Sequence, residues 1–303
     1  MTDRPLLAVD SASLYFRAFH GIPEKAAQTE RGEPVNAIRG FLDMIAQLVR
    51  TRRPDRLVCA LDASWRPAWR VALVPSYKKH RVAHGDVEEV PTALEKQVPV
   101  LLEVLEAVGI PAFGVDGYEA DDVLGTLAVT QRAPVEVVSG DRDLFQLVDD
   151  ERGTRLLYCG RGVAKLEDCD NALVERKYGV PARYYADFAA MRGDPSDGLP
   201  GVPGVGDKTA ARLVTRYGGV EHILAALDDP DAGFAPGLRA KLDGSRAYLA
   251  AALPVCRVAL DVALPGFDPT MPTAPRDPDR LLELAGRWNL AGSARRLVDA
   301  LAG

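Results

Sequence analysis

Acidic side chains gather at the start of one expected helix and at the end of the strand that follows it. The sequence GYEADD at residues 117–122 opens a run whose apolar residues recur at helical spacing, and residues 134–139 read as a strand that leads into GDRD at residues 140–143. Five carboxylates in one helix–strand unit repel one another if they converge without cations. They either point apart into water or surround metal ions, and on this stretch alone the solvated face is favoured.

Other apolar runs in the sequence are also followed closely by an acidic residue. Two runs near the amino terminus end in Asp10 and Asp62, and residues 110–115 lead to Glu119. In a parallel α/β sheet the carboxyl ends of the strands lie along one edge, where sites form. The pattern therefore predicts a mostly parallel sheet between helices, with a divalent-metal site at that edge.

Length and composition describe an ordinary globular protein with acids in excess. The chain has 303 residues, 47% of them hydrophobic, and a net charge of −6, which excludes a uniformly basic coat but not local basic surfaces. The four cysteines show no paired spacing, so we expect reduced thiols and no zinc site. Because no export signal or membrane-length apolar run is found, we expect a soluble, cytoplasmic, nucleoid-associated protein with no membrane partner.

A basic segment follows Asp62 directly. Residues 63–85 hold five Lys and Arg, two His and no acid, with Trp65, Trp69 and Tyr77 interleaved. Basic side chains with aromatic faces form platforms for single-stranded nucleic acid, because charge follows the backbone and rings stack on bases. The alternative is a partly buried loop whose tryptophans pack in the core. The position next to an expected metal ligand favours nucleic-acid binding.

Residues 199–210, LPGVPGVGDKTA, form a glycine-rich loop that leads into a helix. Free N–H groups at such a helix start bind anions, and Lys208, Arg212 and Arg216 recur on one face of the helix. The pattern is that of a helix–hairpin–helix, which grips duplex phosphates without reading bases. A nucleotide-binding P-loop is the rival, but it needs a preceding strand and a lysine directly after the second glycine, where this chain has Asp207.

The remaining elements are expected from periodicity and from turn residues. Helices are expected over residues 36–50, 92–108 and 170–178, and a short hairpin is expected to pair residues 155–158 with residues 162–166. Residues 258–264 read as an extra strand, residues 265–278 as an extended proline-rich connector, and residues 279–302 as terminal helices.

Several motifs occur in the order found in the bacterial 5′-nuclease family. In chain order they are Asp10, Asp62, YKKHR at 77–81, GYEADD at 117–122, GDRD at 140–143, Asp194 with Asp197, and GVGDKTA at 204–210. Over nearly its whole length the chain resembles this flap endonuclease family, which includes the 5′→3′ exonuclease domain of DNA polymerase I. Ser11 departs from the glycine that the family commonly has. Because the chain ends at Gly303, it looks like a stand-alone member.

The resemblance implies a PIN-like nuclease core with a helical arch and a helix–hairpin–helix module. The core is expected over residues 1–180 with the arch at about 63–100, the duplex-binding module over 181–256, and a carboxy-terminal part over 257–303 that packs back on the core.

The resemblance also implies roles for individual residues. One group of metal-binding carboxylates would be Asp10, Asp62, Glu119 and Asp121, and a second would be Asp141, Asp143, Asp194 and Asp197, with Asp122 bridging them or in an outer shell. The expected catalytic residues are Asp141, Asp143, Lys78 and Arg81, the two cations lying at the base of the arch. The expected DNA contacts are Arg17, Arg70, Tyr77, Lys79, Gly204, Gly206, Lys208, Thr209 and Arg212. Tyr77 would stack on a base, Arg70 would steer the displaced strand, and Arg17 is either a phosphate contact or a surface arginine.

The implied activity is hydrolysis of DNA phosphodiesters by a 5′-flap endonuclease and 5′→3′ exonuclease of replication and repair. Its expected cofactors are two or more Mg²⁺ or Mn²⁺ ions, with K⁺ at the hairpin loop. A monomer is expected to act on flapped, gapped or nicked DNA and on single-strand/duplex junctions, beside a DNA polymerase and a ligase. Two other classes stay open: a PIN-like RNA nuclease would lack the basic arch and the hairpin module, and a non-catalytic DNA clamp would lack several of the nine carboxylates.

Overall fold

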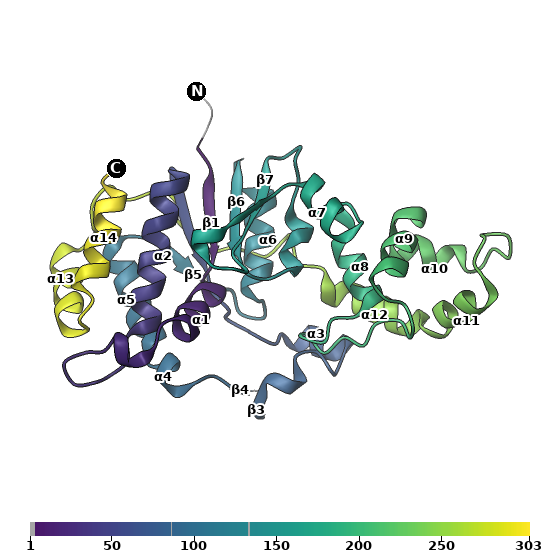
Figure 1. The fold of residues 1–303 in the computed structure, drawn as a ribbon, viewed down its shortest axis with the longest axis horizontal. Helices are drawn as coiled ribbons and strands as arrows, with labels where there is room; N and C mark the ends of the chain where they lie inside the picture. The colour runs from purple at the N-terminus through teal and green to yellow at the C-terminus, as the bar shows by residue number, and fades with distance from the viewer. Residues whose placement is uncertain (1–3, 86, 133) are drawn as a thin grey trace.

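The computed structural model describes residues 4–85, 87–132 and 134–303, and at its centre is a six-stranded sheet in the order β5-β2-β1-β6-β7-β8 (Figure 1). The first five strands in this order run parallel, and β8 is antiparallel to β7. The strands are β1 (Leu6–Asp10), β2 (Arg56–Ala60), β5 (Ala112–Phe113), β6 (Val135–Ser139), β7 (Thr154–Tyr158) and β8 (Glu167–Cys169). The mostly parallel α/β sheet expected from the sequence is confirmed.

Both faces of the sheet are covered, which explains the unbroken apolar runs of its central strands. Within β1, Leu7 and Val9 pack into one apolar layer and Leu6 and Ala8 into the other, and all four are fully buried. One layer holds the helices α1 (Ser11–Gly21), α2 (Asn36–Arg52), α5 (Gln97–Val108), α13 (Pro278–Arg287) and α14 (Ala291–Leu301). The other holds α6 (Ala120–Thr130), α7 (Asn171–Tyr178), α8 (Tyr185–Arg192) and α12 (Arg246–Cys256) (Figure 1).

The segment expected as a helical arch is only partly helical. Between β2 and α5 it forms α3 (Ala68–Leu73), the 3₁₀ turn η2 (Lys79–Arg81), the antiparallel strands β3 (Val82–His84) and β4 (Val87–Glu88), and α4 (Thr92–Glu95). In Figure 1 it runs along the lower side of the molecule from α3 to α4. The helix expected over residues 92–108 is interrupted at Lys96, because Pro99 has no N–H to donate to the carbonyl of Glu95.

The hairpin module extends the second of these layers. The glycine-rich loop joins α8 to α9 (Asp207–Tyr217), and α10 (Val220–Ala226), α11 (Pro236–Gly244) and α12 follow. Helix α8 packs against both α9 and α12. Ala210, Val214 and Leu242 of the module belong to the same apolar core as Leu6 and Ala8 of β1, so the packing is continuous from the sheet into the module. The domain boundaries given above stay a prediction.

Two of the expected strand assignments are wrong. Residues 258–264 form no strand; instead, the N–H groups of Ala259 and Val262 donate to the side chains of Asp122 and Thr126 on α6, at 2.7 and 3.1 Å. The partner of β7 is β8 rather than residues 162–166, because the 3₁₀ turn η4 (Val163–Lys165) intervenes. The helix expected over residues 170–178 is α7, whose first turn is capped by the side chain of Asp170.

The proline-rich connector lies along the edge of β2. The N–H of Leu57 donates to the carbonyl of Pro269 at 2.8 Å, and Thr270 forms an isolated antiparallel bridge with Arg56. The four cysteines are buried and free of disulfides, as their spacing indicated. Within the described parts of the chain, no helix combines the length and the apolar character that crossing a membrane requires.

Candidate active site

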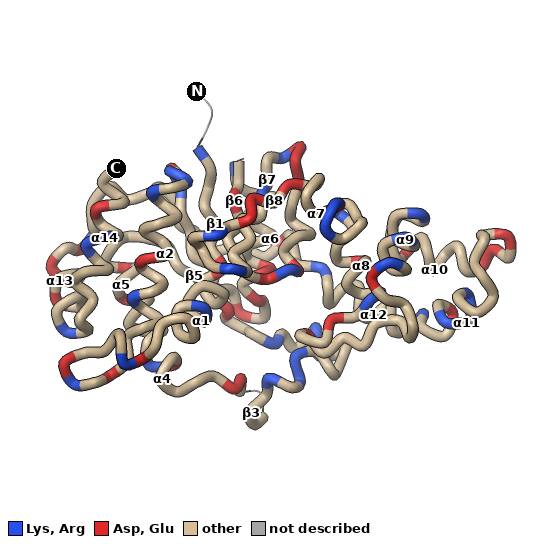
Figure 2. The backbone as a smooth tube through the Cα atoms, in the orientation of Figure 1, with Lys and Arg blue, Asp and Glu red and all other residues tan. Residues whose placement is uncertain are grey.

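Several of the carboxylates singled out in the sequence lie at the carboxyl edge of the sheet. Asp10 is the last residue of β1, and Asp62 and Asp141 lie two positions beyond the ends of β2 and β6. Glu119 caps the amino-terminal end of α6, and Asp121 lies in its first turn. Acidic positions accordingly gather near the centre of Figure 2, at the lower ends of β1 and β6.

A chain of hydrogen bonds ties the acids of two neighbouring strands together. The hydroxyl of Ser139, the last residue of β6, donates to Asp10 at 2.5 Å and accepts the N–H of Asp141 at 2.9 Å. The other Asp10 oxygen accepts the N–H of Ser13 at 3.0 Å, which caps α1. Reasoning from sequence missed both serines, although Ser139 stands directly before the GDRD motif. These bonds orient the carboxylate of Asp10 and fix the backbone that carries Asp141.

Burial and mutual repulsion shift the titration of the first group of acids. Burial raises the pKa of Asp10 to about 7, and the charges of Asp62 and Asp141 add to this effect. Burial, followed by the carboxylates of Asp141, Asp10 and Glu119, also raises the pKa of Asp121 well above its usual range. Acids that disturb one another in this way lie close together, and their ionised forms need a compensating cation.

The charge of Asp141 also acts on a second group of acids. Burial, and then the charges of Asp141, Asp197 and Asp194, raise the pKa of Asp143 well above its usual range. Burial also raises the pKa of Asp197, although the ammonium of Lys78 opposes the rise. The charge of Asp141 therefore raises pKa values in both sets of carboxylates.

The donor set fits hard divalent cations. Every expected ligand is a carboxylate, and carboxylate oxygens suit Mg²⁺ and Mn²⁺ better than soft metals. Across the residues that the structure describes, no three carboxylate, thiol or imidazole groups form a ready-made ion cage. Side-chain cations share the space with the acids: Lys78 pairs with Glu119, and Arg81 pairs with Asp197. Burial is the largest cause of the raised pKa values of Asp10, Asp121 and Asp143, and the neighbouring carboxylates add to it, so a bound cation would stabilise the ionised forms of these acids.

Asp122 lies behind this cluster rather than in it. Its side chain is fully buried, and its oxygens accept from Arg70 at 2.7 and 2.8 Å. They also accept the N–H groups of Glu119 at 3.1 Å and of Ala259 at 2.7 Å. With both oxygens saturated, Asp122 has none free for a metal ion. The prediction of direct metal binding by Asp122 is therefore wrong, and the outer-shell alternative describes its position.

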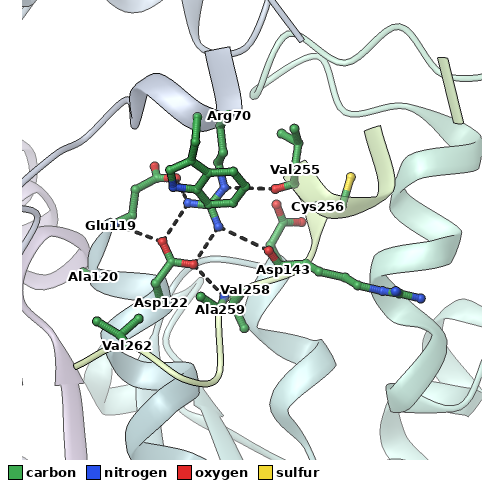
Figure 3. Close-up of polar contacts among 12 residues, drawn as sticks. Arg70, Glu119, Ala120, Asp122, Asp143, Val255, Cys256, Val258, Ala259 and Val262 are labelled. Atoms are coloured by element: carbon green, nitrogen blue, oxygen red, sulfur yellow. Dashed lines mark hydrogen bonds and ion pairs between the residues drawn. The ribbon is translucent and has the colours of Figure 1, made fainter. Parts of the chain in front are cut away.

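Arg70 and Tyr77 are also placed differently from expectation. Arg70 is 2% exposed and pairs with Glu119 and Asp122, and Figure 3 shows it enclosed by these acids and by the carbonyl of Val255. Tyr77 is 3% exposed, and its hydroxyl donates to Glu119 at 2.7 Å. Neither side chain can reach a base or a phosphate from this position. The predicted base stacking by Tyr77 and strand steering by Arg70 are contradicted, because both side chains turn inward toward Glu119.

Three other basic residues expected in the site lie nearer the surface than Arg70. Lys78 points its ammonium toward Glu119 but keeps 13% of its side chain exposed. Burial lowers its pKa, but the nearby Glu119, Asp197 and Asp121 charges outweigh burial and raise that pKa above its usual value, so the ammonium stays charged. Lys79 is exposed, and Arg17 lies against Gly140, beside Asp141.

A glycine allows the arch to approach the second group of acids. Gly198 has a φ of 72°, and a Cβ atom there would lie against the carbonyl oxygen of Ser76 in the arch. Next to it, the N–H of Lys78 donates to the carbonyl of Asp197 at 2.9 Å. This contact fixes Asp197 relative to Lys78.

Gly198→Ala is therefore expected to lower the free energy of unfolding by about 1–3 kcal/mol, because alanine is strained at this φ and clashes with the arch. Urea denaturation measures the change. Gly286→Ala is the matched control, since Gly286 lies on the exposed side of α13 with no atom near the added methyl group. An unchanged midpoint for Gly198→Ala would contradict the close approach.

The residues of the hairpin module lie on one accessible surface. Gly204 has a φ of 73°, Gly206 is the N-cap of α9, and Lys208 and Arg212 are exposed on that helix. Thr209 is half-buried in its first turn. The glycine-rich loop thus presents a helix start flanked by cations, which suits a phosphate backbone.

One link between the module and the acids was missed. Arg192 contacts Asp194 at 3.3 Å and Asp207, the first residue of α9, at 3.8 Å. No pattern in the sequence singles out this arginine, because its two partners come together only in the fold.

Comparison with known proteins agrees with this geometry. A family model described as 5′-3′ exonuclease, N-terminal resolvase-like domain, matches residues 5–179, and one described as 5′-3′ exonuclease, C-terminal SAM fold, matches residues 180–278. A 5′-3′ exonuclease of Streptomyces coelicolor is 52% identical over 97% of this chain and 99% of its own length. A 5′-3′ exonuclease of Mycobacterium tuberculosis is 50% identical over 98% of both chains.

The fold is also shared with a solved structure. This is the bacteriophage T5 flap endonuclease in a pseudo-enzyme–product complex with DNA and metal ions, which is similar with a TM-score of 0.63. The match covers 99% of this chain and all of the phage protein at 19% sequence identity, so it bears on the fold.

Proposed function

This chain belongs to the 5′-3′ exonuclease family, and we propose that it is a divalent-metal-dependent 5′ nuclease that cleaves DNA at 5′ flaps and at single-strand/duplex junctions. The observation that carries this proposal is the meeting of buried and half-buried acids from β1, α6 and the loops after β6 and α8, whose pKa values are raised by burial and then by one another's charges. The DNA and metal ions bound by the phage flap endonuclease support it.

Two groups of carboxylates would hold the metal ions. They are Asp10, Asp62 and Asp121 on one side, joined by Glu119 where a metal ion would replace Lys78 at its Oε1, and Asp141, Asp143, Asp194 and Asp197 on the other. When bound, Mg²⁺ or Mn²⁺ would activate a water molecule and stabilise the charge on the phosphate oxygens during in-line displacement. Ser139 and Ser13 orient Asp10, and Ser139 also fixes the loop that carries Asp141.

Two cations of this chain would help a DNA phosphate to bind next to the acidic residues of the site. Lys78 and Arg81 come from the base of the arch and face Glu119 and Asp197, one acid of each group. A DNA phosphate approaching the acids meets these positive charges first, which offsets the repulsion between phosphate and carboxylates. Lys79 and Arg17, at the margins of the site, would contact the backbone on either side.

The hairpin module would hold the duplex. Gly204, Gly206, Lys208, Thr209 and Arg212 form the surface proposed for it, and contacts to phosphate position DNA without reading sequence. We further propose that K⁺ binds at this loop and that the protein is a monomer. It would act beside a DNA polymerase and a ligase in replication and repair.

Lys208→Ala should weaken binding to duplex-bearing substrates to a similar extent for all sequences. Loss of one phosphate contact should lower the slope of log affinity against log salt by about 1. Fluorescence anisotropy over a salt series measures this slope. Arg295→Ala removes an exposed cation from α14 and should leave the slope unchanged. A loss confined to particular sequences would count against the phosphate contact.

A labelled 5′-flap DNA tests the function itself. We expect cleavage near the junction with Mg²⁺ or Mn²⁺ and none with EDTA, and we expect a nicked duplex to lose short 5′ products. A matched RNA of the same flap geometry separates this activity from that of a PIN-like RNA nuclease. Binding without cleavage in either metal would indicate a DNA clamp, and preferential cutting of single-stranded RNA would indicate the RNA nuclease.

A further inference from the structure

The guanidinium of Arg70 lies at a junction of three parts of the chain. Its Nε donates to the carbonyl of Val255 at 3.2 Å, and Nη1 donates to Glu119 at 2.5 Å and Asp122 at 2.8 Å. Nη2 donates to the second oxygen of Asp122 at 2.7 Å and to the carbonyl of Arg257 at 3.2 Å. All three nitrogens are engaged, and Figure 3 shows the resulting set of bonds.

The three parts joined at Arg70 have different tasks in the proposed nuclease. Arg70 itself belongs to α3, in the arch, and Glu119 and Asp122 begin α6. Val255 and Arg257 lie at the end of α12, the last helix of the hairpin module. A shift of the arch or of α12 would therefore change the hydrogen bonds that hold the first turn of α6.

That first turn carries acids of the candidate metal site. In the sequence, Asp121 lies between Glu119 and Asp122, whose carboxylates form the capping box of α6. Because Arg70 bonds to both of these residues, it limits how Asp121 can move. The arch also reaches the turn through Tyr77 and Lys78, which contact Glu119. Three arch residues thus converge on one metal-site carboxylate.

We propose that Arg70 is a positioning residue that holds the carboxylates of α6 in their metal-binding arrangement and links that arrangement to the arch and to α12. This inference rests on the proposed function. A guanidinium suits the task because its planar fork bonds both oxygens of Asp122 while its remaining donors reach backbone carbonyls. Lysine carries the same charge but offers a single ammonium, so it cannot make all of these bonds.

Arg70→Lys tests the role of the fork with the charge retained. Groups that orient metal ligands from behind typically change metal affinity or activity by about 10- to 100-fold when replaced, and we expect kcat on a 5′-flap substrate to fall by that factor. KM should change little, since Arg70 is buried and does not touch DNA. Binding of Mn²⁺ alone, followed by electron paramagnetic resonance without DNA, should weaken by about 10-fold.

Arg52→Lys is the matched control. Arg52 also joins two carboxylates, Glu136 at 2.9 Å and Asp168 at 3.0 Å, but Glu136 lies near the start of β6, at the opposite end of the strand from Ser139. This variant should lose thermal stability while keeping the Mn²⁺ affinity and kcat of the wild type. Asp122→Asn serves as a second probe should Arg70→Lys not fold, because it keeps the shape of the side chain and weakens the same junction.

The possible results distinguish a positioning role of Arg70 from a structural role and from a DNA contact. If Arg70→Lys, or Asp122→Asn in its place, loses stability as Arg52→Lys does but keeps its Mn²⁺ affinity and kcat, the junction is only structural and the inference is overturned. If KM rises and kcat stays, Arg70 is a DNA contact, which also overturns it. If the wild-type protein neither binds Mn²⁺ nor cleaves, the proposed function has failed, and this is distinguishable from a failure of Arg70 alone.

Discussion

Asp141→Asn is expected to slow flap cleavage by at least about 1,000-fold, which corresponds to about 4 kcal/mol of transition-state stabilisation. The reason is the central place of Asp141, whose charge raises the pKa values of Asp10, Asp121, Asp143 and Asp197. Replacing it with a neutral side chain removes negative charge from both sets of proposed ligands at once. Single-turnover cleavage with saturating Mg²⁺ measures the change.

The same substitution should leave the fold and the grip on DNA in place. The side-chain oxygen of Asp141 accepts the N–H of Asp143 at 2.9 Å, and the amide oxygen of asparagine can accept the same bond. Because the ionised Asp141 repels the acids around it, its neutralisation should raise the melting temperature without divalent metal. It should also reduce the rise in melting temperature that Mn²⁺ produces. Binding of flap DNA through the hairpin module should be nearly unchanged.

Asp149→Asn provides the comparison. Asp149 also lies in a loop and accepts backbone N–H bonds, from Glu151 at 3.0 Å and Arg152 at 3.1 Å, but its charge is not among the main causes of the raised pKa values in the acidic cluster. It should cleave like the wild type. Wild-type cleavage by Asp141→Asn would remove the acidic cluster from the reaction, whatever its effect on stability.

The position of the acids could be predicted because it depends on local patterns. A short apolar run that ends in Asp10 or precedes Asp141 indicates a buried parallel strand, and the carboxyl ends of such strands share one edge. The strand order itself did not have to be known. For the same reason Lys208 and Arg212 could be placed on one face of a helix from their spacing alone.

The inward turn of Arg70 and Tyr77 could not be predicted in this way. A basic segment with interleaved aromatic residues has the same composition whether it faces nucleic acid or packs on buried acids. The deciding partner, Glu119, is 49 residues from Arg70 and 42 residues from Tyr77 in sequence. Only the fold brings them together, and a buried carboxylate with two arginine or lysine partners leaves no periodic signal.

The segment after α12 misled for a related reason. Residues 258–264 form a short, mostly apolar run that reads as a strand, but the N–H groups of Ala259 and Val262 are satisfied by Asp122 and Thr126, side chains on a helix. A sequence pattern shows that backbone donors need partners, not which partners the fold supplies. Asp122 was read as a metal ligand by resemblance for the same reason: its saturation by Arg70 and Ala259 is a tertiary property.

Lys78→Met should lower kcat by about 100- to 1,000-fold, the range found when one preorganised group that stabilises transition-state charge is removed. Lys78 is the arch cation nearest the first group of acids, and the charges around it keep its ammonium protonated. Its partial exposure lets it meet a phosphate, whereas the buried Arg70 cannot. Methionine keeps most of the aliphatic stem, so packing should change little.

A purely structural role for Lys78 predicts a different result. If the Lys78 ammonium served only to balance the charge of Glu119, the variant would mainly lose thermal stability. In Lys78→Met, however, Arg70 and Tyr77 still donate to the Glu119 carboxylate. We therefore expect the melting temperature to change little while kcat falls. Lys79→Met, at the exposed neighbouring position, should raise KM and leave kcat nearly unchanged, since Lys79 is proposed to contact only the DNA backbone. Equal kcat values for the two variants would rule out the separate role of Lys78 at the scissile phosphate.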